Sequence, residues 1–286
     1  MEISSEEKSF TKTNEECISK NALKKKRKWE NIKKANKEKR LQQKQNKRLK
    51  KNNDNTVNRD ESHVSKKDRI QMERKRLLDV LDYSSDSSTN VLETPPLNIC
   101  IDLQFGNKMS EKEISHLANQ LRRVYGANKS SKSPAKLSLV NLDENKRTFK
   151  ILCEKNDGFE NYILHRTEKS VIDEFRSNIE KVIYLTPDSQ TPLEHLDSDK
   201  IYVIGGLVDD SVQKDTTKSY AADNQISTAR LPIEEYCSKN SKGNHTFKQI
   251  LTINQVFDIL LSVYSSKNWS DAFGSVIPHR IGFVSK

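Results

Sequence analysis

Glycine is scarce in this chain. Among 286 residues there are only eight: Gly106, Gly126, Gly158, Gly205, Gly206, Gly243, Gly274 and Gly282. Their positions exclude G-x-G-x-x-G, the P-loop and G-x-S-x-G, the motifs that mark dinucleotide oxidoreductases, P-loop NTPases and α/β-hydrolases. They also exclude the glycine-rich loop of an ordinary Rossmann-type methyltransferase.

Metal ligands and long apolar runs are missing as well. The cysteines Cys17, Cys100, Cys153 and Cys237 form no C-x-x-C pair and there is no H-E-x-x-H motif. We therefore expect no metal site and a reduced, intracellular chain. The longest apolar stretch, residues 201–208, is too short to span a bilayer, and the acidic N-terminus resembles neither a signal nor a transit peptide. We expect a soluble protein of the nucleus or cytoplasm that does not bind membranes.

Positive charge, by contrast, is concentrated in one segment. Residues 20–51, the basic arm, hold 16 Lys or Arg against Glu30 and Glu38, a local balance of +14 in a chain of net charge +10. The rest sums to about −4, so attraction to a polyanion belongs to this arm. We predict a frayed helix that orders on RNA by neutralising phosphates, with contacts from Lys24, Lys25, Lys26, Arg27 and Lys28. A solvated charge run or a nuclear import signal would have the same composition.

A polar linker follows the basic arm. Residues 68–81 have the spacing of a short amphipathic helix, and residues 82–90 are acidic and rich in serine. Pro95 and Pro96 mark the entrance to a folded region. We accordingly divide the chain near residue 95, into a largely disordered or helical RNA-binding extension (1–95) and a catalytic domain (96–286).

Strand and helix patterns alternate in the domain. They predict strands over residues 98–103, 136–142, 181–185, 200–204 and 226–231, and helices over residues 111–125, 169–176, 212–222 and 253–264. Ser110 with Glu113, and Thr252 with Gln255, form capping-box patterns before two of the helices. Gly126 is expected to end the first helix. Such alternation is typical of an α/β fold with a parallel-rich sheet flanked by helices.

Three loops after predicted strands hold residues suited to a ligand, since ligands bind at the carboxyl ends of strands in open α/β sheets. They are Tyr184–Ser189, the end of residues 201–209, and the segment joining residues 229–235 to 250–256. In the second loop, Gly205 and Gly206 allow close backbone approach to a ligand, and Asp209 places a carboxylate at the mouth of the loop. Taken alone, a glycine pair is more often a tight turn than a ligand site, and Asp209 is more often a helix N-cap than a base. These residues by themselves therefore do not identify the reaction.

Five segments resemble, in the same order, the signature blocks of the tRNA purine-9 N1-methyltransferases of the SPOUT class. They are Y-L-T-P-D-S from Tyr184, I-G-G-L-V-D from Ile204, A-R-L-P-I from Ala229, I-N-Q-V-F-D-I-L from Ile253 and W-S-D-A-F from Trp269. I-D-L-Q-F from Ile101, R-R-V-Y-G-A-N from Arg122 and the basic arm are also similar to that family. The blocks that contain Gly206 and Asn254 most resemble the B-type guanine-9 enzymes of vertebrates.

The resemblance implies a SPOUT fold whose C-terminal loops form a trefoil knot and bind S-adenosylmethionine. Periodicity alone cannot show a knot, because knots are rare exceptions to chain topology. By resemblance, the cofactor would be lined, mostly through backbone groups, by Leu185, Thr186, Gly205, Gly206, Leu207, Leu231, Pro232, Ile233, Leu251, Thr252 and Asn254. Lys214 and Lys248 would reach its carboxylate or the RNA. The family also implies a monomer that methylates guanine N1 at position 9 of tRNA.

The chemistry makes Asp209 the candidate general base. Guanine N1 carries a proton that must leave before N1 can attack a methyl group, so Asp209 would accept it or orient N1 and a water. Adenine N1 has a free lone pair, and the residues do not exclude it. Arg122, Arg123 and Lys129 are a second candidate RNA surface, or else a solvated helix end. Two other functions stay open: a non-catalytic RNA-binding or ribonucleoprotein assembly factor, and an enzyme acting on a small nucleotide.

Overall fold

The computed structural model describes residues 65–84, 92, 94–208, 216–239, 251–277 and 283–285, and the isolated residues Asn31 and Glu38. Contacts divide the chain into Met1–Val64 and a second unit, Ser65–Lys286. The predicted helix of the basic arm and its proposed phosphate contacts fall outside the described residues and stay predictions. All further description concerns the second unit.

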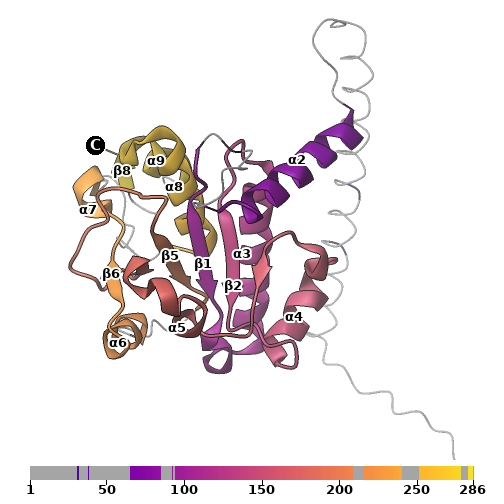
Figure 1. Ribbon diagram of the computed structural model, residues 1–286, viewed down its shortest axis with the longest axis horizontal. Helices are drawn as coiled ribbons and strands as arrows, with labels where there is room; N and C mark the ends of the chain where they lie inside the picture. Colours follow the sequence, from indigo (N-terminus) through magenta and orange to yellow (C-terminus); the bar gives the residue numbers. More distant parts are fainter. Residues whose placement is uncertain are drawn as a thin grey trace, which may run out of the picture. The chain divides into compact units, whose positions relative to one another are not determined.

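A parallel sheet forms the centre of this unit. Its strands are β1 (Asn98–Asp102), β2 (Lys136–Val140), β3 (His165–Arg166), β4 (Val182–Leu185), β5 (Ile201–Gly205) and β6 (Ser227–Ala229). They lie in the order β3-β2-β1-β5-β4-β6, and every neighbouring pair is parallel. Figure 1 shows β1 between β2 and β5. The predicted α/β fold with a parallel-rich sheet is confirmed.

Two apolar layers cover the two faces of the sheet. On one face, Ile99 and Ile101 of β1 pack in a cluster with Leu117 of α3 (Glu111–Ser130) and Phe257 of α8 (Ile253–Ser266). The other face has a smaller cluster, in which Cys100, Val140, Tyr184 and Val203 meet Val171 of α5 (Val171–Glu174) and Ala221 of α6 (Thr216–Asp223). Alternate residues of each strand thus point into different clusters, as the pleat requires.

Shorter elements complete the unit. They are α2 (Lys66–Leu81), α4 (Arg147–Lys155), α7 (Ile233–Tyr236), α9 (Trp269–Val276), the 3₁₀ helices η1 (Gln104–Lys108), η2 (Phe159–Asn161) and η3 (Arg176–Lys181), and the antiparallel pair β7 (Cys237–Lys239) and β8 (Phe283–Ser285). In Figure 1, α2 runs beside β2 and α3. Leu77 and Val80 of α2 are buried, so this helix packs on the domain although it precedes the boundary near residue 95 expected from composition.

Both predicted capping boxes are present. The Glu113 amide donates to Ser110 Oγ at 3.3 Å, while the Ser110 amide donates to Glu113 Oε2 at 2.7 Å. The Thr252 amide likewise donates to Gln255 Oε1 at 3.0 Å. Local hydrogen-bonding chemistry was therefore enough to place the starts of α3 and α8.

The predicted helix end at Gly126 is wrong, because α3 continues to Ser130. No atom lies within 4 Å of where a Cβ on Gly126 would stand, so this glycine is tolerated without shaping the turn. The helix ends instead where the buried Asn128 side chain donates to the Ala135 carbonyl at 2.9 Å and accepts from its amide at 2.8 Å. These bonds fold the following loop back toward β2.

Other predicted elements differ in length. The helix predicted over residues 169–176 is only α5, a single turn followed by the irregular η3. Helices α4 and α9 were not predicted. No helix in the described ranges is long and apolar enough to cross a membrane. The trefoil knot remains a prediction, since residues 240–250, between β7 and α8, lie outside the description.

Candidate functional site

A buried carboxylate lies at the carboxyl end of the central strand. Asp102, the last residue of β1, has no exposed surface. Its Oδ2 accepts from the Tyr184 hydroxyl at 2.8 Å and from Gln104 Nε2 at 2.5 Å, and its Oδ1 accepts from Asn141 Nδ2 at 2.6 Å and the Gln104 amide at 3.1 Å. Donors from β4, from η1 and from the end of β2 thus converge on one acid. We call Asp102, Gln104, Asn141 and Tyr184 the Asp102 cluster.

Burial and hydrogen bonding act in opposite directions on this acid. Desolvation raises the pKa of the Asp102 carboxyl, while the bonds from Tyr184, Asn141 and Gln104 lower it, and the net shift is upward. Burial and the neighbouring Asp102 charge raise the pKa of Tyr184 well above its usual value. The Tyr184 hydroxyl therefore stays protonated at neutral pH and donates the hydrogen bond to Asp102.

The loop after β5 is pinned against the same acid. The Gly206 amide donates to the Asp102 carbonyl at 2.7 Å, and a Cβ on Gly206 would stand 2.7 Å from that oxygen and 2.8 Å from Leu103 Cδ2. Only glycine fits there. At Gly205 a Cβ would make ordinary contacts, the nearest at 3.5 Å. The close contact at Gly206 is thus with the β1 backbone, and the predicted approach of this pair to a ligand stays a prediction.

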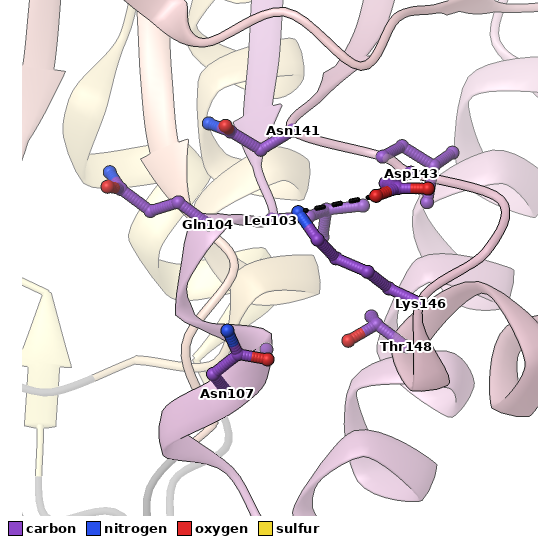
Figure 2. A pocket seen from close by; sticks show the side chains of 9 residues that line it. Leu103, Gln104, Asn107, Asn141, Asp143, Lys146 and Thr148 are labelled. Atoms are coloured by element: carbon purple, nitrogen blue, oxygen red, sulfur yellow. Dashed lines mark ion pairs between the residues drawn. The ribbon is translucent and has the colours of Figure 1, made fainter.

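A small polar cavity opens beside the Asp102 cluster. It has a volume of about 80 Å³ and is lined by residues that include Gln104, Asn107, Asn141, Lys146 and Thr148. Figure 2 shows the carboxamides of Gln104 and Asn141 on the side of the cavity away from the Lys146–Asp143 ion pair, whose charged atoms are 3.6 Å apart. Asn141 has φ +54°, a left-handed conformation that asparagine tolerates better than most residues.

The predicted cofactor residues gather at the neighbouring strand ends. Leu185 ends β4 and pairs with Ile204 of β5 and Ala229 of β6, and the Thr186 amide donates to the Ala229 carbonyl at 2.9 Å. Gly205, Gly206 and Leu207 follow in the β5 loop, and Leu231, Pro232 and Ile233 follow β6. Sheet order thus brings together three of the predicted segments.

The fourth predicted segment begins α8. Leu251 is partly buried against the main core, Thr252 caps the helix, and Asn254 Oδ1 accepts from the Thr252 hydroxyl at 3.1 Å. The Ile253 amide donates to Gln120 Oε1 of α3 at 2.9 Å. This bond ties the segment to the domain, and its lining role stays a prediction.

The predicted RNA residues are only partly described. Arg122 and Arg123 lie exposed on α3, where Arg122 donates to Asn119 Oδ1 at 3.0 Å. Lys129, farther along α3, lies 3.8 Å from Glu73 of α2. Asp209, Lys214 and Lys248 fall outside the described residues, as do the lysines and arginine of the basic arm. Val208, which precedes Asp209, donates its amide to Met109 Sδ at 3.4 Å, so the chain leaves the described region beside η1.

The Asp102 cluster was not predicted from the sequence. The sequence held one signal for it: Asp102 is a charged residue directly after the apolar residues Ile99, Cys100 and Ile101, which are fully buried in the structure. No metal site was predicted, and the described residues hold no group of three His, Cys, Asp or Glu that could bind a metal ion.

The structure resembles two solved methyltransferase structures whose sequences are 34% and 35% identical to this chain. It matches the crystal structure of full-length spTrm10 in complex with SAH with a TM-score of 0.57 and 34% identity, covering 66% of this chain and 99% of the other. The crystal structure of spTrm10(74) gives 0.58 and 35%, covering 65% and 96%. The α/β fold with its parallel sheet is therefore that of the SPOUT methyltransferases.

The sequence comparisons are more specific. The family model of the tRNA (guanine(9)-N(1))-methyltransferase TRM10/TRM10A matches residues 16–282. The chain is 37% identical to tRNA methyltransferase 10 homolog B of Bos taurus, over 93% of this chain and 79% of that protein. It is 36% identical to the tRNA (guanine(9)-N1)-methyltransferase of Schizosaccharomyces pombe, over 66% and 60%. The chain belongs to this family.

Proposed function

We propose that this protein methylates N1 of guanine 9 in tRNA, with S-adenosylmethionine as methyl donor. The observation that carries the proposal is the Gly206 amide bond to the Asp102 carbonyl, which fixes the β5 loop beside a buried polar cluster in a chain of this family. Family membership favours an enzyme over a non-catalytic RNA-binding factor. It also explains the basic arm, which a small-nucleotide enzyme would not need.

The predicted cofactor loops offer the methyl donor both apolar and polar groups. Leu207, Leu231 and Leu251 pack against the main core yet stay partly exposed, as apolar walls for an adenine ring would. Leu185, Thr186, Gly205, Pro232, Ile233, Thr252 and Asn254 would supply backbone and small polar contacts around them. When bound, the donor supplies an electrophilic methyl group on a sulfonium; this chain's residues must position the nucleophile and remove its proton.

Asp209 is the proposed base. It follows Val208, whose amide bond to Met109 Sδ holds the end of the described β5 loop against η1. An ordinary aspartate has a pKa of about 3.9, below that of the guanine imide, so it works best when partly desolvated or when it acts through a water. Holding guanine N1 near Asp209 would turn deprotonation and attack into one oriented event.

The tRNA would be held by separate basic groups. Arg122 and Arg123 are exposed on α3 and suit phosphate contact. Lys24–Lys28 would add long-range attraction, and Lys129, Lys214 and Lys248 further contacts. We also propose that the protein acts as a monomer, in the nucleus or cytoplasm.

The decisive experiment incubates the full chain with bulk tRNA and a labelled methyl donor, then maps the modified nucleotide. We expect N1-methylguanine at position 9. Label at another position would contradict the site assignment. No label, with RNA binding intact, would favour a non-catalytic binding factor, and label on free nucleotides would favour the small-nucleotide enzyme.

A further inference from the structure

The Asp102 cluster fixes the orientation of two carboxamides. Gln104 Nε2 and Asn141 Nδ2 donate to different oxygens of the Asp102 carboxylate, at 2.5 and 2.6 Å. A carboxylate only accepts hydrogen bonds, so the NH₂ end of each amide must face it. The carbonyl ends, Gln104 Oε1 and Asn141 Oδ1, therefore face away from Asp102.

These two carbonyl ends belong to partly exposed side chains. Asn141 Oδ1 accepts no hydrogen bond from the described part of the chain, whereas the Gln104 amide also has a hydrogen-bonding interaction with the Tyr220 hydroxyl. In Figure 2 the two amide groups extend to the same side of the cavity. The left-handed backbone of Asn141 is a second sign of constraint, because such strain persists where surrounding contacts hold it. The result is a pair of amide oxygens held in fixed positions; each NH₂ group keeps one N–H beyond the one that Asp102 accepts.

The pair lies where the target base must come. The loops predicted to bind S-adenosylmethionine follow β4, β5 and β6. Gln104 and Asn141 instead follow β1 and β2, which lie on the other side of β5 in the sheet. Gly206 contacts Asp102 directly, so the two halves of the site meet there. A base that reaches the methyl group of S-adenosylmethionine past the loop after β5 would present one of its edges to the Gln104 and Asn141 amides.

Guanine and adenine differ at the edge that such acceptors can read. The methyl group approaches N1 in the plane of the ring, so N1 must stay clear, and positions 2 and 6 flank it. Guanine carries an acceptor oxygen at position 6, so only its position 2 can donate to amide oxygens. Guanine carries there an amino group with two N–H donors, while adenine and inosine carry only C–H. We infer that Gln104 and Asn141 recognise the exocyclic 2-amino group of the target guanine. The inference rests on the proposed function.

The test compares tRNA transcripts that carry guanine, inosine or adenine at position 9. Inosine keeps the N1 proton and the 6-oxygen of guanine and lacks only the 2-amino group. We expect kcat/KM for guanine-9 to exceed that for inosine-9 by roughly 30-fold or more, because a site built to bind N–H groups discriminates against a substrate without them. Adenine-9 carries its amino group at position 6 instead, so an adenine-9 rate equal to that of guanine-9 would contradict recognition at position 2.

Two variants test whether Gln104 and Asn141 cause the discrimination between guanine and inosine. Gln104→Met keeps the length of the side chain without its amide, and Asn141→Gly keeps the left-handed backbone. Each should lower kcat/KM for guanine-9 more than that for inosine-9, so that the guanine-to-inosine ratio falls toward one. Gln71→Met, at an exposed glutamine of α2, makes the same chemical change away from the site and should keep the wild-type ratio. Calorimetric binding of S-adenosylhomocysteine checks that each variant is folded.

The outcomes separate this inference from the proposed function. No methylation of guanine-9 tRNA by the wild type would contradict the function itself. Methylation of guanine and inosine at equal rates by the wild type would overturn the inference alone, even if the variants fail to fold. Folded variants that keep the wild-type ratio would overturn it as well.

Discussion

Tyr184 and Asp102, 82 residues apart in sequence, share a buried hydrogen bond of 2.8 Å from the Tyr184 hydroxyl to Asp102 Oδ2. The bond joins β4 to β1 across the end of β5, the strand between them. It therefore links β4, which precedes the predicted cofactor residues Leu185 and Thr186, to the Asp102 cluster.

Replacing Tyr184 with phenylalanine should destabilise the protein. Asp102 would lose one of its donors while staying buried, and a hydrogen bond to a charged group contributes about 1.5–3 kcal/mol. Urea denaturation at neutral pH would measure the free energy of unfolding. Tyr162→Phe is the control, because that tyrosine stacks on Tyr125 and its hydroxyl makes no hydrogen bond within the described residues. Equal stability of the two variants would mean that the Tyr184–Asp102 bond adds nothing.

Adding a methyl group at Gly206 should have the opposite effect from adding one at Gly126. Gly206→Ala places Cβ 2.7 Å from a backbone oxygen, so the β5 loop must shift, at a cost of about 1–3 kcal/mol and with weaker cofactor binding. Gly126→Ala lies in open space within α3 and should stabilise by roughly 0.5–1 kcal/mol. Thermal denaturation with and without S-adenosylhomocysteine compares them. A Gly206 variant as stable as the Gly126 variant would show that the loop has room.

The stability of the protein should depend on pH through Asp258. Desolvation raises the pKa of this α8 carboxyl from 3.8 to about 6. A raised acid pKa favours the folded state below the unfolded pKa, and this contribution is lost as pH rises through about 6. Asp258→Asn should therefore stabilise the protein at pH 8 and have little effect at pH 4, as urea denaturation at the two pH values would measure. An equal effect at both would mean that charge is not the cause.

Changing Asp209 to asparagine should separate chemistry from binding. A general base contributes roughly 10²–10⁴-fold to rate, so methylation of tRNA should slow by about that factor. Affinity for tRNA, measured by filter binding, should hardly change. A wild-type rate in the variant would remove Asp209 from the chemistry.

Neutralising the arm should change how binding responds to salt. The slope of log affinity against log salt concentration falls by about 0.9 for each phosphate that the protein no longer neutralises. Converting Lys24–Lys28 to glutamine should thus flatten the slope in titrations with tRNA from low to physiological salt. If slopes of the variant and the wild type coincide, these five side chains do not contact phosphate.

Local signals explain what the sequence could predict. Capping residues and apolar periodicity lie within one or two turns of each other, so the starts of α3 and α8 and most strands were located. Helix α4 was missed because it has nine residues and its N-cap, Lys146, makes no side-chain capping bond. The α3 end was misplaced because its determinant, the Asn128–Ala135 pair, involves the loop beyond the helix.

The candidate site also has a part that could be predicted and a part that could not. Leu185, Gly205 and Leu231 could be proposed because the family's motifs are contiguous in sequence. The Asp102 cluster could not, since its members come from residues 102, 104, 141 and 184 and only strand order brings them together. A polar residue at the end of a buried strand is a weak signal until its distant donors are known.

The order of the sheet has a consequence for how the protein is made. Strand β1 pairs with β5, and Asn98 meets Ile201 across a separation of about one hundred residues. Pairing over such distances must close long loops, which slows folding. On the ribosome, β1 leaves the exit tunnel well before its β5 neighbour exists, with an edge exposed to other chains. The buried surroundings of Asp102 need Asn141, Tyr184 and the β5 strand, so they can be completed only after residue 205 has been made.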